Sequence, residues 1–168
     1  VLRGGEGDDI LDVADATFQR ISGGLGTDTL RFSSNSQAFD FTGTGNQGVT
    51  GIEAISLTGG SASITVDALS VLGMSDTSNT IRVTGAATDT LDISDAGSWT
   101  ATSATNETVT LTNGQATLIV DQAMTLNPAF TPPAPSVIDL SALDGAEGFS
   151  FSGSGVSDES GRSVSDAG

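Results

Sequence analysis

The chain has 168 residues, of which 21 are acidic and 5 are basic, and its formal net charge is −16 at pH 7. Such a charge disfavours nucleic acid as a partner, because no basic patch is available to neutralise phosphates. Cysteine and histidine do not occur at all, which excludes disulfides, zinc–thiolate sites, thiol catalysis and the commonest general base.

The first predicted element is a nine-residue pattern that occurs twice, at residues 4–12 and 23–31. Both copies fit Gly-Gly-x-Gly-x-Asp-x-U-x, where U is a large aliphatic residue, here Leu11 and Leu30. Glycines adopt positive φ angles readily, so each copy is expected to fold into a tight turn whose carbonyl oxygens point inward. The x-U-x part is expected to form a very short strand with its leucine in an apolar interior.

Such a turn offers the oxygen ligands that a hard cation requires. Ca²⁺ takes six to eight oxygen atoms, and Asp9 or Asp28 at the end of each turn adds the charge that carbonyl groups lack. Turns on the same side of a roll would face one another, so we expect one complete calcium site and a half-site at the N-terminal edge. The candidate ligands are Gly4, Gly5, Glu6, Gly7 and Asp9 in the first copy, and Gly23, Gly24, Leu25, Gly26 and Asp28 in the second.

Other carboxylates near the two turns are expected to play lesser roles. The side chains of Glu6, Asp8 and Asp12 are expected to be solvated, although the backbone oxygens of Glu6 and Asp8 remain candidate ligands. Asp15 lies between the copies, on the opposite side of the roll, where it would be a poor ligand. Ordinary glycine–aspartate loops without a metal are the alternative, and two full copies of the pattern disfavour it.

Beyond the repeats, alternating apolar residues and turn signals predict short strands. The expected strands are residues 31–32, 38–41, 52–57, 63–66, 80–83, 90–93, 108–111 and 116–120. Residues 67–74 break the alternation, and their apolar spacing predicts a short helix that is capped by Asp67 and ends near Gly73. Asn113-Gly114 is a pair that two-residue hairpin turns prefer, so the last two strands are expected to form a hairpin.

The C-terminal part is expected to be organised differently. Four prolines lie in residues 127–135, which predicts an extended and fairly stiff linker. Residues 161–168 resemble the opening of an FG-GAP repeat, the blade unit of integrin-like β-propellers. Because a blade needs four strands, we expect residues 136–168 to be an incomplete β unit that requires partner strands. A flexible tail rich in glycine and serine is the alternative.

The two copies of the pattern resemble the hemolysin-type calcium-binding repeat of RTX proteins. The phrases at residues 51–57, 71–76 with 79–85, 89–93 with 99–100, and 112–121 resemble, in the same order, a module of very large RTX-type secreted and surface proteins of Gram-negative bacteria. The resemblance covers residues 1–126. It implies export by a type I system, calcium-dependent folding outside the cell, and a role in adhesion, biofilm or cell-surface layers.

These features predict an all-β fold in four parts. The parts are a short parallel β-roll at residues 1–32, a β-rich module with one short helix at residues 33–126, a linker at residues 127–135, and a partial FG-GAP-like segment at residues 136–168. No signal peptide or transmembrane segment is found in the sequence. Because the chain starts directly before a repeat and stops without an obvious terminating element, we expect a piece of a longer protein, with any targeting signal outside it and no membrane insertion.

The expected function is that of a calcium-stabilised structural or adhesive segment of a secreted, extracellular or cell-surface protein, without catalytic activity. Its expected partners are calcium ions and neighbouring modules, with like chains at strand edges or a surface glycan or protein as further partners. The alternative is an accessory calcium-binding or carbohydrate-binding module of a secreted hydrolase. An exposed Trp99 would favour sugar binding, and carboxylate pairs such as Asp92 with Asp95 or Asp139 with Asp144 would be required for a glycosidase.

Overall fold

The computed structural model describes residues 1–131, except 16, 44–47, 76 and 106. In this part the strands form three sheets. The first contains β1 (Leu2–Glu6), β3 (Ile21–Leu25) and β6 (Val49–Thr50). The largest contains, in spatial order, β11 (Thr100–Ala104), β12 (Thr108–Thr112), β13 (Thr117–Asp121), β9 (Thr80–Thr84), β7 (Ala54–Leu57), β4 (Thr29–Phe32) and β2 (Ile10–Val13). The third contains β14 (Thr125–Asn127), β10 (Thr90–Ile93), β8 (Ser63–Val66) and β5 (Ala38–Asp40).

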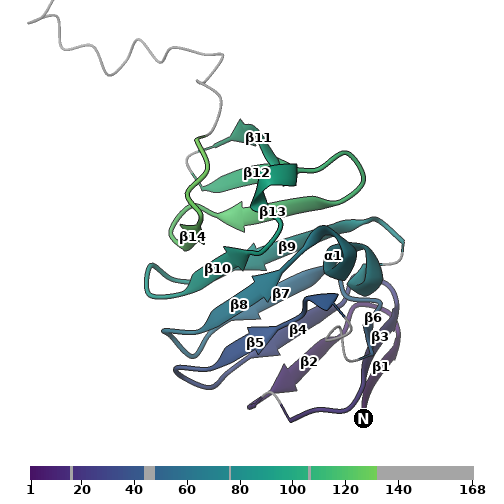
Figure 1. The fold of residues 1–168 in the computed structure, drawn as a ribbon. Helices are drawn as coiled ribbons and strands as arrows, with labels where there is room; N and C mark the ends of the chain where they lie inside the picture. Colours follow the sequence, from purple (N-terminus) through teal and green to yellow (C-terminus); the bar gives the residue numbers. More distant parts are fainter. Residues whose placement is uncertain (16, 44–47, 76, 106, 132–168) are drawn as a thin grey trace, which may run out of the picture. The chain divides into compact units, whose positions relative to one another are not determined.

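The chain winds through these sheets in repeated circuits, so that each circuit stacks on the one before it (Figure 1). Strands of successive circuits pair in parallel, as β2, β4, β7, β9 and β13 do in the largest sheet. The antiparallel pairs of this sheet join β11 to β12 and β12 to β13. The described part is therefore a β-rich solenoid with one short α-helix, which agrees with the expected all-β class.

Val1–Pro135 form one compact unit. The boundary expected between residues 32 and 33 falls inside this unit, because β4 pairs with β7 from Thr29↔Ala54 to Phe32↔Leu57. Residues 132–135 of the expected linker and the whole FG-GAP-like segment at 136–168 lie outside the described residues.

Alternation of side chains creates the solenoid core. On β4, Leu30 and Phe32 are fully buried while Thr29 and Arg31 are partly exposed, as the two-residue period of a strand dictates. Leu11 is buried on β2 in the same way, so the inward position expected for both leucines of the repeats is confirmed. Apolar side chains of the three sheets meet in one cluster, to which Ile21, Phe39, Ile55, Ile64, Leu91 and Leu118 contribute.

The expected helix is confirmed as α1 (Ala68–Met74). Asp67 accepts a hydrogen bond from Ser70 N at 2.7 Å, and Asp67 N donates to Ser70 Oγ at 2.8 Å, which is a capping box. In the fourth circuit α1 follows β8 in the chain, where earlier circuits have a strand of the first sheet. A short 3-10 helix, η2 (Ala96–Ser98), stands at this point of the next circuit.

The sequence located most later strands correctly, with β8 and β10 at their expected bounds. The hairpin expected around Asn113-Gly114 is confirmed, because β12 and β13 pair antiparallel, but its connection is longer than two residues. The paired strands end at Thr112 and resume at Thr117, so four residues connect them. Asn113 closes this longer turn with its side chain, since its Oδ1 accepts from Gln115 N at 3.3 Å and from Ala116 N at 2.9 Å. A local Asx-type bond competes here with the shorter turn.

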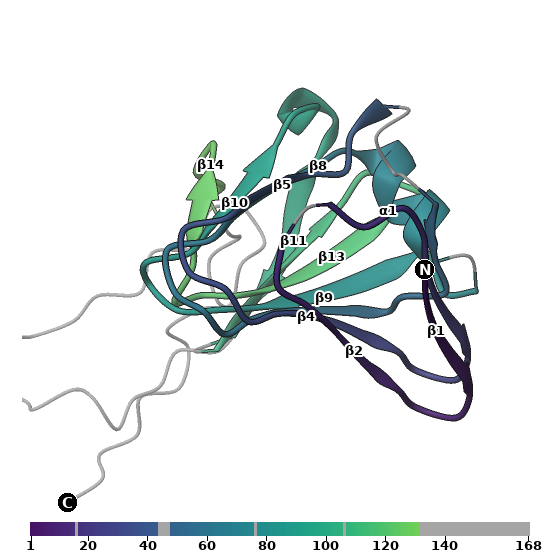
Figure 2. The same cartoon turned by 90° about the horizontal axis from the view of Figure 1, so that it is seen from below.

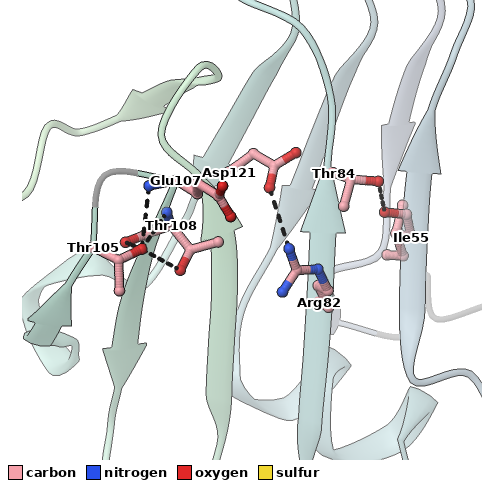
Figure 3. Close-up of polar contacts among 7 residues, drawn as sticks. All are labelled: Ile55, Arg82, Thr84, Thr105, Glu107, Thr108 and Asp121. Atoms are coloured by element: carbon pink, nitrogen blue, oxygen red, sulfur yellow. Dashed lines mark hydrogen bonds and ion pairs between the residues drawn. The ribbon is translucent and has the colours of Figure 1, made fainter.

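The outer face of the largest sheet carries polar contacts between neighbouring strands (Figure 3). Arg82 Nη2 on β9 lies 3.7 Å from Asp121 Oδ1 on β13, and Thr84 Oγ1 donates to Ile55 O at 3.4 Å. The Arg82 and Asp121 side chains are 49% and 27% exposed, so this ion pair contributes little to stability. None of the helices in the described part is long and apolar enough to cross a membrane.

Candidate metal centre

The two glycine-rich copies form stacked corners of the first and second circuits. The strands before the corners pair at Gly5↔Gly24, and the strands after them pair at Ile10↔Thr29, an offset of 19 residues. The expectation that both turns lie on the same side is therefore confirmed. Figure 2 shows the corner between β1 and β2 projecting from the solenoid.

One local detail of the expected turn is wrong. The first two glycines of each copy lie in β1 and β3, and only residues 7–9 and 26–28 lie between the strands. Stacking explains the difference, because two identical glycine segments in register can satisfy their backbone groups by parallel pairing.

Glycine is required at this corner because backbones approach very closely. A Cβ atom at Gly23 would lie 1.8 Å from Gly51 O and 2.5 Å from Asp28 Oδ2, and one at Gly4 would lie 2.5 Å from Gly23 O. Gly24 has a φ of +122°, and its Cβ would lie 2.0 Å from Gly5 O. Carbonyl oxygens and aspartate carboxylates therefore occupy the space where side chains of other residues would stand.

Hydrogen bonds join the two corners. Asp9 N donates to Asp28 Oδ1 at 2.9 Å, and Gly7 N donates to Leu25 O at 2.7 Å. Thr27 N donates to Asp8 Oδ1 at 2.7 Å, so Asp8 is not simply solvated as expected. Its exposed carboxylate links one corner to the next.

One carboxylate oxygen of each closing aspartate lacks such a partner. Asp9 Oδ2 and Asp28 Oδ2 are buried and have no hydrogen-bond partner among the described residues. Asp28 as a whole is fully buried. A buried acceptor without a donor costs about 1–3 kcal/mol, and more when it is charged. Both oxygens therefore mark places where a cation would remove a substantial cost.

The residues present offer oxygen ligands only, a donor set that fits Ca²⁺. Within the described residues, no group of three or more His, Cys, Asp or Glu side chains comes together to hold a metal ion. A cation at this corner would therefore take oxygens from Asp9, Asp28, backbone carbonyl groups and water. Oxygen-only ligation with flexible geometry suits Ca²⁺, whereas transition metals favour imidazole or thiolate ligands.

Glu6 and Leu25, two further predicted ligands, have exposed side chains, that of Leu25 being 68% exposed. Both would offer backbone carbonyl oxygens to an ion at this corner. Leu25 O already accepts from Gly7 N, which leaves it one lone pair.

Asp12 was expected to be solvated but forms an ion pair across two strands. Arg31 Nε donates to Asp12 Oδ1 at 2.7 Å, and Arg31 Nη2 contacts Asp12 Oδ2. The hydrogen bonds from Arg31 lower the pKa of Asp12 below its usual value, and the pKa of Arg31 is raised by the same pairing. Both groups are exposed, so this pair lies outside the metal corner.

Sequence reasoning missed Glu53. The pairing Thr29↔Ala54 places Glu53 in the same column as Asp9 and Asp28. Glu53 Oε2 accepts from Asp28 N at 2.9 Å. A signal was available, because residues 51–55, Gly-Ile-Glu-Ala-Ile, repeat the tail Gly-x-Asp-x-U with glutamate for aspartate.

Asp92, Asp95 and Trp99, which lie far from this corner, form structural contacts. Asp95 Oδ1 accepts from Trp99 Nε1 at 2.7 Å, and Trp99 is 5% exposed, so Trp99 does not provide an exposed sugar platform. Asp92 accepts from Ser63 Oγ at 2.8 Å and from the side chain of Asn127. Asp139 and Asp144 lie outside the described residues.

No family model, no curated protein and no solved structure matches this chain. A functional assignment therefore depends on the residues and the geometry of the glycine corners.

Proposed function

We propose that this chain is a calcium-stabilised structural or adhesive segment of a large, type I-secreted bacterial protein that acts outside the cell or at its surface. The observation that carries the calcium part is the pair of buried carboxylate oxygens without donors, Asp9 Oδ2 and Asp28 Oδ2, inside two stacked glycine corners. The secretion route and location rest on the resemblance of the repeats to RTX proteins.

Calcium binding at this corner would be coupled to local folding. The two aspartates are brought together only when β1 and β3 pair, so an ion that bridges the corners stabilises the paired state. Extracellular Ca²⁺ is abundant, whereas the cytosol holds little, so the corner would order after export. A net charge of −16 strengthens this coupling, because divalent cations reduce self-repulsion in the folded chain.

The structural part of the proposal rests on the solenoid architecture. In the described part of the chain, β2 and β11 are the edge strands of the largest sheet. Open edges can pair with strands of a neighbouring module or of a like chain. A scaffold, an adhesin stalk or a surface-assembly subunit would use such edges to continue its length.

The decisive experiment is a calcium titration of the full chain by isothermal titration calorimetry, with circular dichroism melts in Ca²⁺ and in EGTA. The wild type should bind Ca²⁺ and melt at a higher temperature in its presence. Asp9→Asn with Asp28→Asn should abolish both effects.

The control for this titration is Asp12→Asn, which removes an acidic charge from β2 without touching the unpartnered oxygens. It should bind Ca²⁺ as the wild type does. Equal melting temperatures of the wild type in Ca²⁺ and EGTA, or unchanged affinity in the double variant, would contradict the proposal.

A further inference from the structure

The third circuit closes the column of glycine corners with a shorter corner. Between the paired positions Ser22↔Thr50 and Thr29↔Ala54, the second circuit has residues 23–28 whereas the third has only residues 51–53. Ile52 is fully buried in this short corner, and its N–H donates to Met74 O at 3.0 Å. A side chain therefore occupies the third corner, where the second has a glycine loop with an acidic interior.

Glu53 holds the peptide groups on both sides of Asp28. Glu53 Oε2 accepts from Asp28 N at 2.9 Å, while the N–H groups of Glu53 and Ala54 donate to Asp28 O at 3.1 and 3.0 Å. The first of these contacts repeats the bond from Asp9 N to Asp28 Oδ1, which also measures 2.9 Å. The same position in the second and third circuits thus supplies a carboxylate to the amide of the circuit before it.

We propose that Glu53 is a positioning residue of the cation site and marks the end of the column of sites. By fixing Asp28 N and Asp28 O, Glu53 holds the backbone from which the Asp28 carboxylate projects, and so keeps Oδ2 directed at the inside of the corner beside Gly23. This inference rests on the proposed calcium function and adds to it a residue from outside the glycine repeats.

Side-chain length is central to this role. Glutamate reaches the amide of Asp28 from the shortened corner, and aspartate at the same position would be one methylene shorter. Groups that orient a metal ligand typically change metal affinity by about 10- to 100-fold when they are replaced. The inference therefore separates two properties of Glu53, namely the reach of its acceptor oxygen and its negative charge.

The test is a calcium titration of the Glu53→Gln and Glu53→Asp variants of the 168-residue chain by isothermal titration calorimetry. Glu53→Gln keeps the reach and an acceptor oxygen but loses the charge, and it should retain the wild-type affinity within about threefold. Glu53→Asp keeps the charge but loses the reach, and it should weaken binding by about tenfold or more. Glu107→Gln, which removes a charge from the exposed turn between β11 and β12, is the matched control and should bind as the wild type does.

A second measurement reports the contact without calcium. Hydrogen exchange of the Asp28 amide in EGTA should be slow in the wild type and in Glu53→Gln, and faster in Glu53→Asp. The opposite order of affinities, with Glu53→Gln the weaker binder, would overturn the positioning role in favour of the charge. Equal affinity in all variants would overturn this inference alone, whereas a wild type that binds no Ca²⁺ would overturn the proposed function as well.

Discussion

Two buried aspartates at corners of the solenoid differ in one respect. Asp28, before β4, and Asp89, before β10, are both fully buried. Asp89 Oδ1 accepts from Ala62 N at 2.9 Å and Asp89 Oδ2 accepts from Ala86 N at 2.8 Å. Asp28 Oδ1 accepts from Asp9 N, but Asp28 Oδ2 has no donor among the described residues.

The two aspartates are of the same residue type and equally buried, but only one has a donor for each carboxylate oxygen. The chain itself supplies every donor that the Asp89 carboxylate uses, so its corner is complete without a ligand. The Asp28 corner leaves an acidic oxygen inside a space lined by glycines, and an external cation would complete it. Burial alone does not distinguish the two aspartates, whereas the count of donors does.

The largest expected effect comes from adding a methyl group to each corner. Gly23→Ala would place its Cβ 1.8 Å from Gly51 O, which is backbone and cannot move aside, so the loss should reach or exceed the upper end of the about 1–3 kcal/mol typical of overpacking. Gly85→Ala would meet Asp89 Oδ2 and Met124 Sδ at 3.0 Å, and the flexible methionine can yield. Urea unfolding in EGTA measures the loss of stability in both variants. Equal losses would contradict the expectation that Gly23→Ala is the more destabilising.

The next effect is the calcium-dependent part of stability. At a free Ca²⁺ concentration 100 times the dissociation constant, the wild type should gain about 2.7 kcal/mol over its stability in EGTA. Asp28→Asn should lose this gain, and Asp89→Asn should keep it, since Asp89 lies in another corner. The measurement is the free energy of unfolding of each variant with and without Ca²⁺. A gain preserved in Asp28→Asn would show that Asp28 does not bind the cation.

In EGTA, Asp89→Asn should lower the free energy of unfolding more than Asp28→Asn does. Asp89→Asn turns an acceptor into an amide that faces a backbone N–H, so it should cost about 1–3 kcal/mol. Asp28→Asn keeps an acceptor for Asp9 N and removes a buried charge without a partner, so its stability should be unchanged or higher. A larger loss for Asp28→Asn than for Asp89→Asn in urea unfolding would show that the Asp28 corner is satisfied without a cation.

The smallest effect concerns the exposed pair of Asp12 with Arg31. Arg31 lowers the pKa of Asp12 in the folded state, so the pair stabilises the fold above the ordinary pKa of aspartate and loses this effect as the pH falls through the lowered value. Asp12→Asn should lower the melting temperature slightly at pH 7, and the difference from the wild type should vanish in strong acid. A difference that grows on acidification would contradict the assigned partner.

Local patterns predicted the elements that local chemistry determines. Asp67 and Ser70 cap α1 through bonds within one turn, and the alternation at residues 63–66 and 90–93 places strands correctly. The two repeats predicted the stacked corners because their spacing matches one circuit. Neighbours in the sequence carried the information for the helix and the strands, and the spacing of a local pattern carried it for the corners.

Features that depend on pairing between circuits were not visible in the sequence. Glycine-rich segments such as residues 2–6 have low strand propensity, and only their partners in the next circuit make them strands. Glu53 was overlooked because its role follows from the register of β4 and β7. The four-residue turn at Asn113 likewise depends on where β12 and β13 pair.

The short third corner has a thermodynamic consequence for the proposed calcium segment. Neighbouring strands in a sheet lie about 4.8 Å apart, so the interior changes from acidic oxygens at Asp28 to the buried aliphatic side chain of Ile52 within one strand spacing. Circuits before this step would open and close with the ionic environment, while circuits after it would keep a fixed free energy of opening. The molecule would thus contain circuits whose opening depends on calcium next to circuits whose opening does not, with Glu53 at the boundary.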